Sequence, residues 1–157
     1  MKKSFVFKPA PLIFQLILSL GGGFLVGLLT NNSEYFNTLV KPPLTPPATL
    51  FPIAWTILYT LMAVSASLIL SSKEGRESGV MKIYYLQLII NFIWPFLFFV
   101  FNFLELSFIW ILLLIALVGY MIYKFYGINK TAALLQIPYF LWLVFAAYLN
   151  LGYVILN

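Results

Sequence analysis

Five long apolar runs follow one another along the chain, and they limit its fold more than any other feature does. They occupy residues 12–30, 49–70, 80–101, 106–125 and 131–156, with charged side chains only near their ends. A helix needs about 20 apolar residues to cross a bilayer, whereas the strands of a membrane barrel alternate polar with apolar residues, which these runs do not do. The sequence therefore predicts an all-α integral membrane protein, with residues 1–157 forming a single domain that is a bundle of five transmembrane helices.

The composition excludes a soluble globular domain. Hydrophobic residues make up 63% of the 157 residues and charged residues only 8%, whereas soluble domains carry about 25% charged residues. The formal net charge of +5 is spread singly over the loops, without a basic stripe that could follow phosphates, so we expect no nucleic-acid partner. The first apolar run exceeds the roughly 7 to 15 residues typical of a signal peptide, and we expect it to be a retained span.

The basic residues predict the orientation in the membrane. In a five-span arrangement Lys41 lies on one side, and all other basic residues lie on the opposite side: Lys2, Lys3, Lys8, Lys73, Arg76, Lys82, Lys124 and Lys130. Loops rich in Lys and Arg stay in the cytoplasm. For a bacterial cell membrane this pattern predicts a cytoplasmic N-terminus and a C-terminus outside.

The connection between the first two runs, residues 31–48, is the only long one. Its prolines, all within residues 42–47, and Pro52 just beyond them oppose a regular helix, because proline fixes φ and has no N–H to donate. We expect a semi-rigid lid across one mouth of the bundle, in which residues 40–47 become ordered when a ligand binds. The other connections are short, so neighbouring helices must pack antiparallel.

Polar and aromatic residues share one face of the third run. Gln87, Asn91 and Trp94 follow one another at spacings of four and three, which places them on the same side of a helix. Two amides within a bilayer need hydrogen-bonding partners. They act either as a structural link between helices or as a polar patch that orients a ligand in a cavity.

The second and fifth runs carry similar faces. The fifth has a residue of this face at every fourth position: Pro138, Trp142, Ala146 and Asn150. In the second run Trp55, Tyr59 and Met62 form a stripe just after the proline-rich segment. A tryptophan near the end of a span is either an anchor at the membrane interface or part of a pocket wall.

The residue types also limit the chemistry. The chain has no His, Cys or Asp, so we expect neither a metal site nor a resident cofactor. Ordinary nucleophiles and acid–base groups are missing from the spans as well. Because Lys, Arg and Glu fall in loops or at run ends, proton relays of the kind used by pumps are not expected.

Three motifs resemble the translocator protein family (TspO/MBR, the peripheral-type benzodiazepine receptors), in a bacterial form. The first is K-P-P-L-T-P-P-A-T-L-F-P-I-A-W-T-I-L-Y at 41–59, the second Q-L-I-I-N-F-I-W-P-F-L-F-F at 87–99, and the third P-Y-F-L-W-L-V-F-A-A-Y-L-N at 138–150. The resemblance implies a five-helix membrane receptor that forms homodimers. It also implies binding of porphyrins and of benzodiazepine-site ligands in a cavity beneath the first loop.

The family's ligand-cavity positions fall on defined residues of this chain. They are Pro46, Trp55, Gln87, Asn91, Trp94, Pro138, Trp142, Ala146 and Leu149. Animal members end the fifth helix with a cholesterol motif in which a basic residue follows a tyrosine. Here that stretch reads L-N-L-G-Y-V-I-L-N, with Leu151 and Ile155 at the motif positions, so specific cholesterol binding is not expected.

Trp55 and Trp142 are the candidate catalytic residues. By the resemblance both face the cavity, and the absence of other reactive groups leaves the photochemistry of a bound porphyrin as the source of any reaction. The resulting hypothesis is light-dependent oxidative degradation of the porphyrin beside two indoles. The alternatives are binding without chemistry, in which both tryptophans only pack, and transport of porphyrin or another apolar ligand across the membrane.

Overall fold

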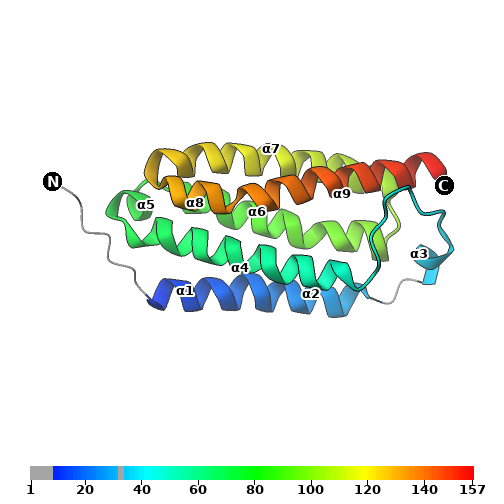
Figure 1. Cartoon of the computed structure of the whole chain (residues 1–157), viewed down its shortest axis with the longest axis horizontal. Coiled ribbons are helices and arrows are strands. Elements are labelled where there is room, and N and C mark those ends of the chain that lie inside the picture. The colour runs from blue at the N-terminus through cyan, green and yellow to red at the C-terminus, as the bar shows by residue number, and fades with distance from the viewer. Residues whose placement is uncertain (1–8, 32–33) are drawn as a thin grey trace.

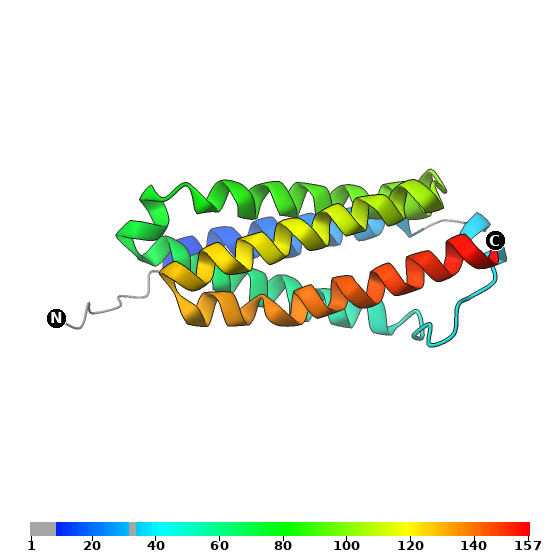
Figure 2. The same ribbon diagram turned by 90° about the horizontal axis from the view of Figure 1, so that it is seen from above.

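The structure, a computed structural model, describes residues 9–31 and 34–157. Its five long segments run side by side along one axis (Figures 1 and 2). They are α1 (Pro9–Leu16) with the π-helical turn η1 (Ile17–Gly21) and α2 (Gly22–Thr30); α4 (Leu50–Ser71); α6 (Val80–Pro95) with the π-helical turn η2 (Phe96–Val100); α7 (Leu104–Ile128); and α8 (Lys130–Leu135) with α9 (Ile137–Leu156). Each is long and apolar enough to cross a membrane. The predicted membrane bundle of five helices is confirmed.

Two short helices lie at opposite ends of the bundle (Figure 1). Helix α3 (Glu34–Thr38) belongs to the first connection, and α5 (Lys73–Glu77) to the second. The sequence did not predict α3, which ends before the first proline of the connection, and residues 40–48 contain no helix. We call the end with α3 and the C-terminus the loop end, and the end with α5 the tail end.

Three of the five spans are interrupted. In the first, the hydroxyl of Ser19 in η1 donates to the carbonyl oxygens of Gln15, at 2.8 Å, and Tyr59, at 3.1 Å. In the third, η2 follows Pro95. In the fifth, the helix breaks at Gln136, and Pro138 lies in the first turn of α9, where its missing N–H leaves no helical bond unmade.

The helices are not packed equally tightly against one another. α7 packs closely against α6 and α9, and α4 packs closely against α1 and α8. α4 meets α9 at far fewer points. Since α8 lies at the tail end and α9 continues from it to the loop end (Figure 1), the α4–α9 seam opens towards the loop end, where side chains must fill it.

Candidate functional site

Aromatic side chains fill the seam between α4 and α9. The Trp55 ring stacks on Tyr59 with centroids 5.2 Å apart. It also meets the Trp142 ring edge-on at 6.5 Å and Tyr139 at 6.3 Å. Phe51, one turn before Trp55, meets the Trp142 ring at 6.0 Å. The two tryptophans from different helices are therefore neighbours, and together they cover the interior.

A chain of hydrogen bonds lies beside these rings and joins α4, α6 and α9. The Tyr59 hydroxyl donates to Asn91 Oδ1 at 2.7 Å. Asn91 Nδ2 donates to the Tyr139 hydroxyl at 3.1 Å, which in turn donates to Gln87 Oε1 at 2.9 Å. Both amides are buried. Their hydrogen bonds link helices, which agrees with the interpretation of this face as a structural link. Gln87 Nε2, however, has no hydrogen-bond partner among the described residues.

A second polar cluster lies nearer the loop end. Trp94 Nε1 donates to Asn150 Oδ1 at 3.2 Å, and the Ser107 hydroxyl donates to the same oxygen at 3.0 Å. Asn150 Nδ2 donates to the carbonyl oxygen of Leu104 at 2.9 Å. The Trp94 ring stacks on Phe98, with centroids 5.0 Å apart. These contacts join α6, α7 and α9 and fix the plane of Trp94.

Between the two polar clusters lies a cavity of about 10 Å³. It is lined by Trp55, Asn91, Trp94, Ile111, Leu114, Leu143 and Ala146. A space of this size holds about one water molecule, whereas pockets for small organic ligands measure roughly 300–1,000 Å³. The cavity is thus far too small for a flat ligand of tetrapyrrole size, and binding such a ligand requires the surrounding helices to separate.

The structure brings together most, but not all, of the residues that the sequence placed at the site. Four of them line the cavity directly: Trp55, Asn91, Trp94 and Ala146. Gln87 accepts a hydrogen bond from Tyr139, which in turn accepts one from the cavity-lining Asn91. Trp142 packs against the ring of the cavity-lining Trp55. Leu149 is buried outside this lining, Pro46 is half-buried in the loop, and Pro138 is exposed at the start of α9.

Several residues that build the site were not among the site residues that the sequence predicted. Tyr59 shares a helix face with Trp55, so its position had a signal in the spacing. Tyr139 and Ser107 had none, because their partners lie 48 and 43 residues away along the chain. The α7 contribution, from Ile111 and Leu114, had no signal either, because the residues around both of them are apolar.

The site is electrically neutral. No Lys, Arg or Glu is buried in the part of the chain that the structure describes. Its polar groups are phenols, amides, one hydroxyl and indole N–H groups, all of which offer hydrogen bonds without a full charge. Such a site suits an apolar ring system and offers nothing to a strongly charged ligand in the interior.

The segment that covers the loop end is attached to the last turns of α9. The Val40 backbone N–H donates to Asn157 Oδ1 at 2.8 Å, and Asn157 Nδ2 donates back to the Val40 carbonyl oxygen at 3.2 Å. The Tyr148 hydroxyl donates to the Pro43 carbonyl oxygen at 3.1 Å. Leu44 has a φ of +64°, in the left-handed region. The segment is thus held at a few points rather than packed throughout.

Comparison with known proteins decides the family. The profile of the TspO/MBR family matches residues 15–156. The chain belongs to the TspO/MBR family. It is 32% identical over 132 residues to the tryptophan-rich protein TspO of Chlorobaculum tepidum, which covers 80% of each chain.

Other relatives extend from archaea to animals. The chain is 31% identical over 149 residues to the tryptophan-rich protein TspO of Archaeoglobus fulgidus, covering 93% of this chain and 96% of the relative. It is 32% identical over 142 residues to the translocator protein of Bos taurus, covering 87% and 83%, respectively. Family membership and the five apolar helices identify an integral membrane protein of the receptor or translocator type.

Proposed function

We propose that this protein is a membrane receptor for tetrapyrroles with a flat, apolar ring system, such as protoporphyrin, and for benzodiazepine-site ligands, which bind between α4 and α9. The observation that carries the proposal is the set of ring faces from Trp55, Tyr59 and Trp142 above a neutral floor of hydrogen-bonded amides. Ring faces stack on a flat aromatic ligand. The floor offers Gln87 Nε2, a buried donor without a partner among the described residues, to a ring substituent.

Binding in this proposal requires the α4–α9 seam to open. The cavity of about 10 Å³ is far too small for the ligand, and the seam is held by few contacts between the two helices. The Trp55–Trp142 and Phe51–Trp142 contacts close it by ring edges alone. Among the residues that the structure describes, no side-chain hydrogen bond joins α4 directly to α9, so separating these rings breaks none and this seam offers the easiest path to the interior. The loop above it, including Pro46, acts as the lid.

The proposed chemistry is slow oxidative degradation of the bound porphyrin under light. The porphyrin absorbs the light, and molecular oxygen is the oxidant. The protein holds the ring against Trp55 and Trp142, which are the most easily oxidised groups beside the cavity, and excludes bulk water. In this reaction the protein therefore positions the porphyrin and supplies two electron-rich indoles beside it.

A transporter of the same ligand is the second candidate, and the packing of the tail half argues against it. Below the hydrogen-bond chain, the interior is filled by fully buried side chains, including Met62, Ala66, Met121 and Phe125. A ligand that entered at the loop end would find no open path to the tail end through these residues. Porphyrin flux into liposomes that contain the protein measures this directly, and sustained flux would favour the transporter.

A binding titration tests the receptor proposal. Protoporphyrin is added to the protein in lipid nanodiscs, and binding is followed by the porphyrin absorbance in the dark. Replacing Trp142 by Leu removes one ring face and should weaken binding about tenfold, since stacked aromatic contacts contribute about 0.5–1.5 kcal/mol beyond their buried area. Trp110→Leu is the matched control, because Trp110 donates to the Ile90 carbonyl oxygen away from the cavity. Equal affinities for wild type and Trp142→Leu would exclude this site.

We also propose that the loop end faces the outside of the cell, because all the basic residues that the structure describes, except Lys41, lie at the tail end. The chain contains no cysteine, so single cysteines report their side without background. Ala48→Cys at the loop end and Ser78→Cys at the tail end are both exposed positions. An impermeant thiol reagent added to intact cells should label Ala48→Cys only. Labelling of Ser78→Cys alone would reverse the orientation.

A further inference from the structure

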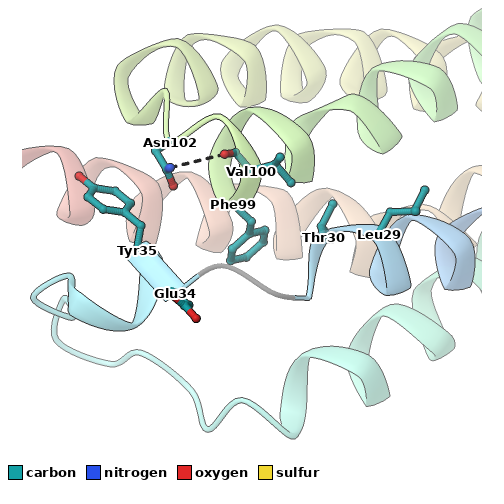
Figure 3. Close-up of a pocket in the computed structure, with 7 residues that line it drawn as sticks. All are labelled: Leu29, Thr30, Glu34, Tyr35, Phe99, Val100 and Asn102. Carbon is teal, nitrogen blue, oxygen red and sulfur yellow. Dashed lines mark hydrogen bonds between the residues drawn. The ribbon is translucent and has the colours of Figure 1, made fainter.

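The two ends of the bundle differ in charge. At the loop end, α2, α3 and η2 border a cavity of about 280 Å³, and the charged residue among those that line it is the acidic Glu34 (Figure 3). The tail end is basic instead, and its described basic residues are Lys73, Arg76, Lys82, Lys124 and Lys130. Of these, Lys124 and Lys130 lie where α7 turns into α8 (Figure 1).

Three exposed tyrosines accompany these two lysines on the last turns of α7. Tyr120, Tyr123 and Tyr126 are 50%, 72% and 51% exposed. Lys124 Nζ lies 5.4 Å from the centroid of the Tyr120 ring. Lys130 Nζ lies at the same distance, 5.4 Å, from the centroid of the Tyr126 ring. Each lysine side chain therefore folds back over a ring of α7, and this contact holds its ammonium group close to the helix surface.

The protein itself does not neutralise these two charges. All four glutamates of the chain lie in its described part, and the ion pair formed there joins Glu77 to Lys73 at 3.9 Å. Among the described residues, Lys124 and Lys130 form neither an ion pair nor a hydrogen bond. Two positive charges close together repel each other, so an anion placed between them is attracted by both.

The surface between the two lysines has room for such an anion. Gly127 lies midway between them in the chain, and a Cβ there would meet no atom within 4 Å. Its bare backbone leaves a notch beside the exposed ring of Tyr123. Farther towards the loop end, α7 carries a strip of exposed apolar side chains, namely Ile109, Leu112 and Leu113. A basic notch that continues into an apolar strip fits a charged headgroup with acyl chains attached.

The position of the notch along α7 matches the headgroup layer of a bilayer. Helix α7 has 25 residues and is about 37 Å long at 1.5 Å per residue, whereas the hydrocarbon core measures about 30 Å. Its last turns therefore reach beyond the acyl chains to the depth at which phosphates lie. Tyrosine side chains are typical of that depth, and basic residues close to a span attract anionic lipids.

We propose that the surface formed by Tyr120, Tyr123, Lys124, Gly127 and Lys130 binds the headgroup phosphate of an anionic phospholipid. The two ammonium groups flank the phosphate, and the acyl chains lie along the apolar strip of α7. Phosphatidylglycerol has the required net negative charge. Phosphatidylethanolamine fits less well, because its own ammonium group offsets the charge of its phosphate and is repelled by the lysines. The bound lipid joins the end of α7 to the start of α8.

Native mass spectrometry of the full chain in detergent tests the proposal. The protein is offered equal amounts of phosphatidylglycerol and phosphatidylethanolamine with identical acyl chains, and we expect phosphatidylglycerol to be retained preferentially. Lys124→Gln and Lys130→Gln should each reduce that retention about fivefold, and the double variant about twentyfold, which is the usual contribution of basic residues near an anionic membrane surface. Lys82→Gln is the matched control, since Lys82 is an exposed tail-end lysine on α6, outside the proposed surface.

The outcomes separate a defined site from a general effect of charge. A preference for phosphatidylglycerol that is lost in the double variant and kept in Lys82→Gln supports the site. An equal loss in Lys82→Gln and in either single variant means that only the overall charge of the tail end attracts the lipid, which overturns the proposal. Equal retention of both lipids by wild type, or an unchanged preference in the double variant, overturns it as well. All three lysines are exposed, so the variants should fold, and far-UV circular dichroism checks this.

Discussion

The two halves of the bundle are packed with different kinds of side chain. In the tail half, α4 packs closely on α8, and its small residues Ala63, Ala66 and Ser65 are fully buried. The Ser65 hydroxyl donates to the Ala132 carbonyl oxygen at 2.7 Å, which joins the helices directly. In the loop half, α4 and α9 meet through large aromatic rings, and amides carry the links between helices.

This difference in packing indicates that the two halves have different roles. Small residues allow close approach of helices, which is the main source of stability in a bilayer where lipid and side chains are equally apolar. Rings that meet edge to edge leave gaps, and they can turn aside without breaking hydrogen bonds. We infer that the tail half keeps the fold while the loop half opens for the ligand. Substituting matched residues in the two halves tests this difference.

The largest effect should come from enlarging one alanine in each half. Ala66→Leu inserts three carbon atoms between tightly packed helices and should destabilise the protein by about 3 kcal/mol. Ala146 lines the small cavity and is half-buried. The leucine of Ala146→Leu therefore has room, and the loss of stability should stay below about 1 kcal/mol. Unfolding in mixed micelles with increasing SDS measures both.

Ligand binding should show the reverse order for the same pair. Leu at position 146 occupies the space that the ligand needs, and we expect at least about a tenfold loss of porphyrin affinity, or 1.4 kcal/mol. Folded Ala66→Leu protein should bind as wild type does. If the two variants were equally destabilised, or if Ala146→Leu bound normally, the division between the halves would be wrong.

A glycine pair on the first span should give the next largest effect. A Cβ at Gly23 would collide with the Tyr59 ring, whereas one at Gly27 would meet no atom within 4 Å. Gly23→Ala must therefore displace Tyr59 and weaken its hydrogen bond to Asn91, which we expect to lower stability by about 2 kcal/mol. Gly27→Ala should be neutral or slightly stabilising because alanine favours helix. The same unfolding assay compares them, and equal stabilities would mean that Tyr59 is not fixed by this contact.

How far the sequence could predict this molecule depended on the solvent that each residue faces. The spans followed from hydrophobicity and length alone, because a bilayer accepts little else. It was harder to predict which face of a span points inward and which points to lipid. Leu143 in the core and Leu141 on the lipid side, for example, are both leucine. Only polar residues such as Gln87 and Asn91 marked an inner face. Pro138 shared the spacing of that face in the fifth run, yet it is exposed, because the helix breaks just before it.

The tryptophan pair tests the chemistry proposed for the loop half. Phe in place of Trp55 or Trp142 keeps a ring face but removes the more easily oxidised indole. At saturating protoporphyrin under light, we expect each variant to lose porphyrin about five to ten times more slowly than wild type, or about 1–1.4 kcal/mol. Trp110→Phe should match wild type. If all three variants degrade porphyrin at the wild-type rate while binding persists, both tryptophans are packing residues.

The smallest effect should be a local change in the loop, and a second glycine pair isolates it. A Cβ at Gly152 on α9 would lie 2.6 Å from Pro42 Cβ, and a proline ring cannot rotate away as a flexible side chain can. Gly152→Ala must therefore lift residues 40–47 from α9 and loosen the bonds that join Val40 to Asn157.

Hydrogen exchange measures this loosening at the backbone N–H groups of Val40, Leu44 and Thr45. We expect exchange about fivefold faster in Gly152→Ala, equivalent to about 1 kcal/mol of lost protection. Gly127→Ala adds the same methyl group where no atom lies within 4 Å, so its exchange should equal that of wild type. Saturating porphyrin should slow exchange in wild type if the segment is a lid, because closing it over the ligand orders these residues. A loop that exchanges at the same rate with and without ligand, and in both variants, would be a fixed cover, and entry would then depend on the α4–α9 seam alone.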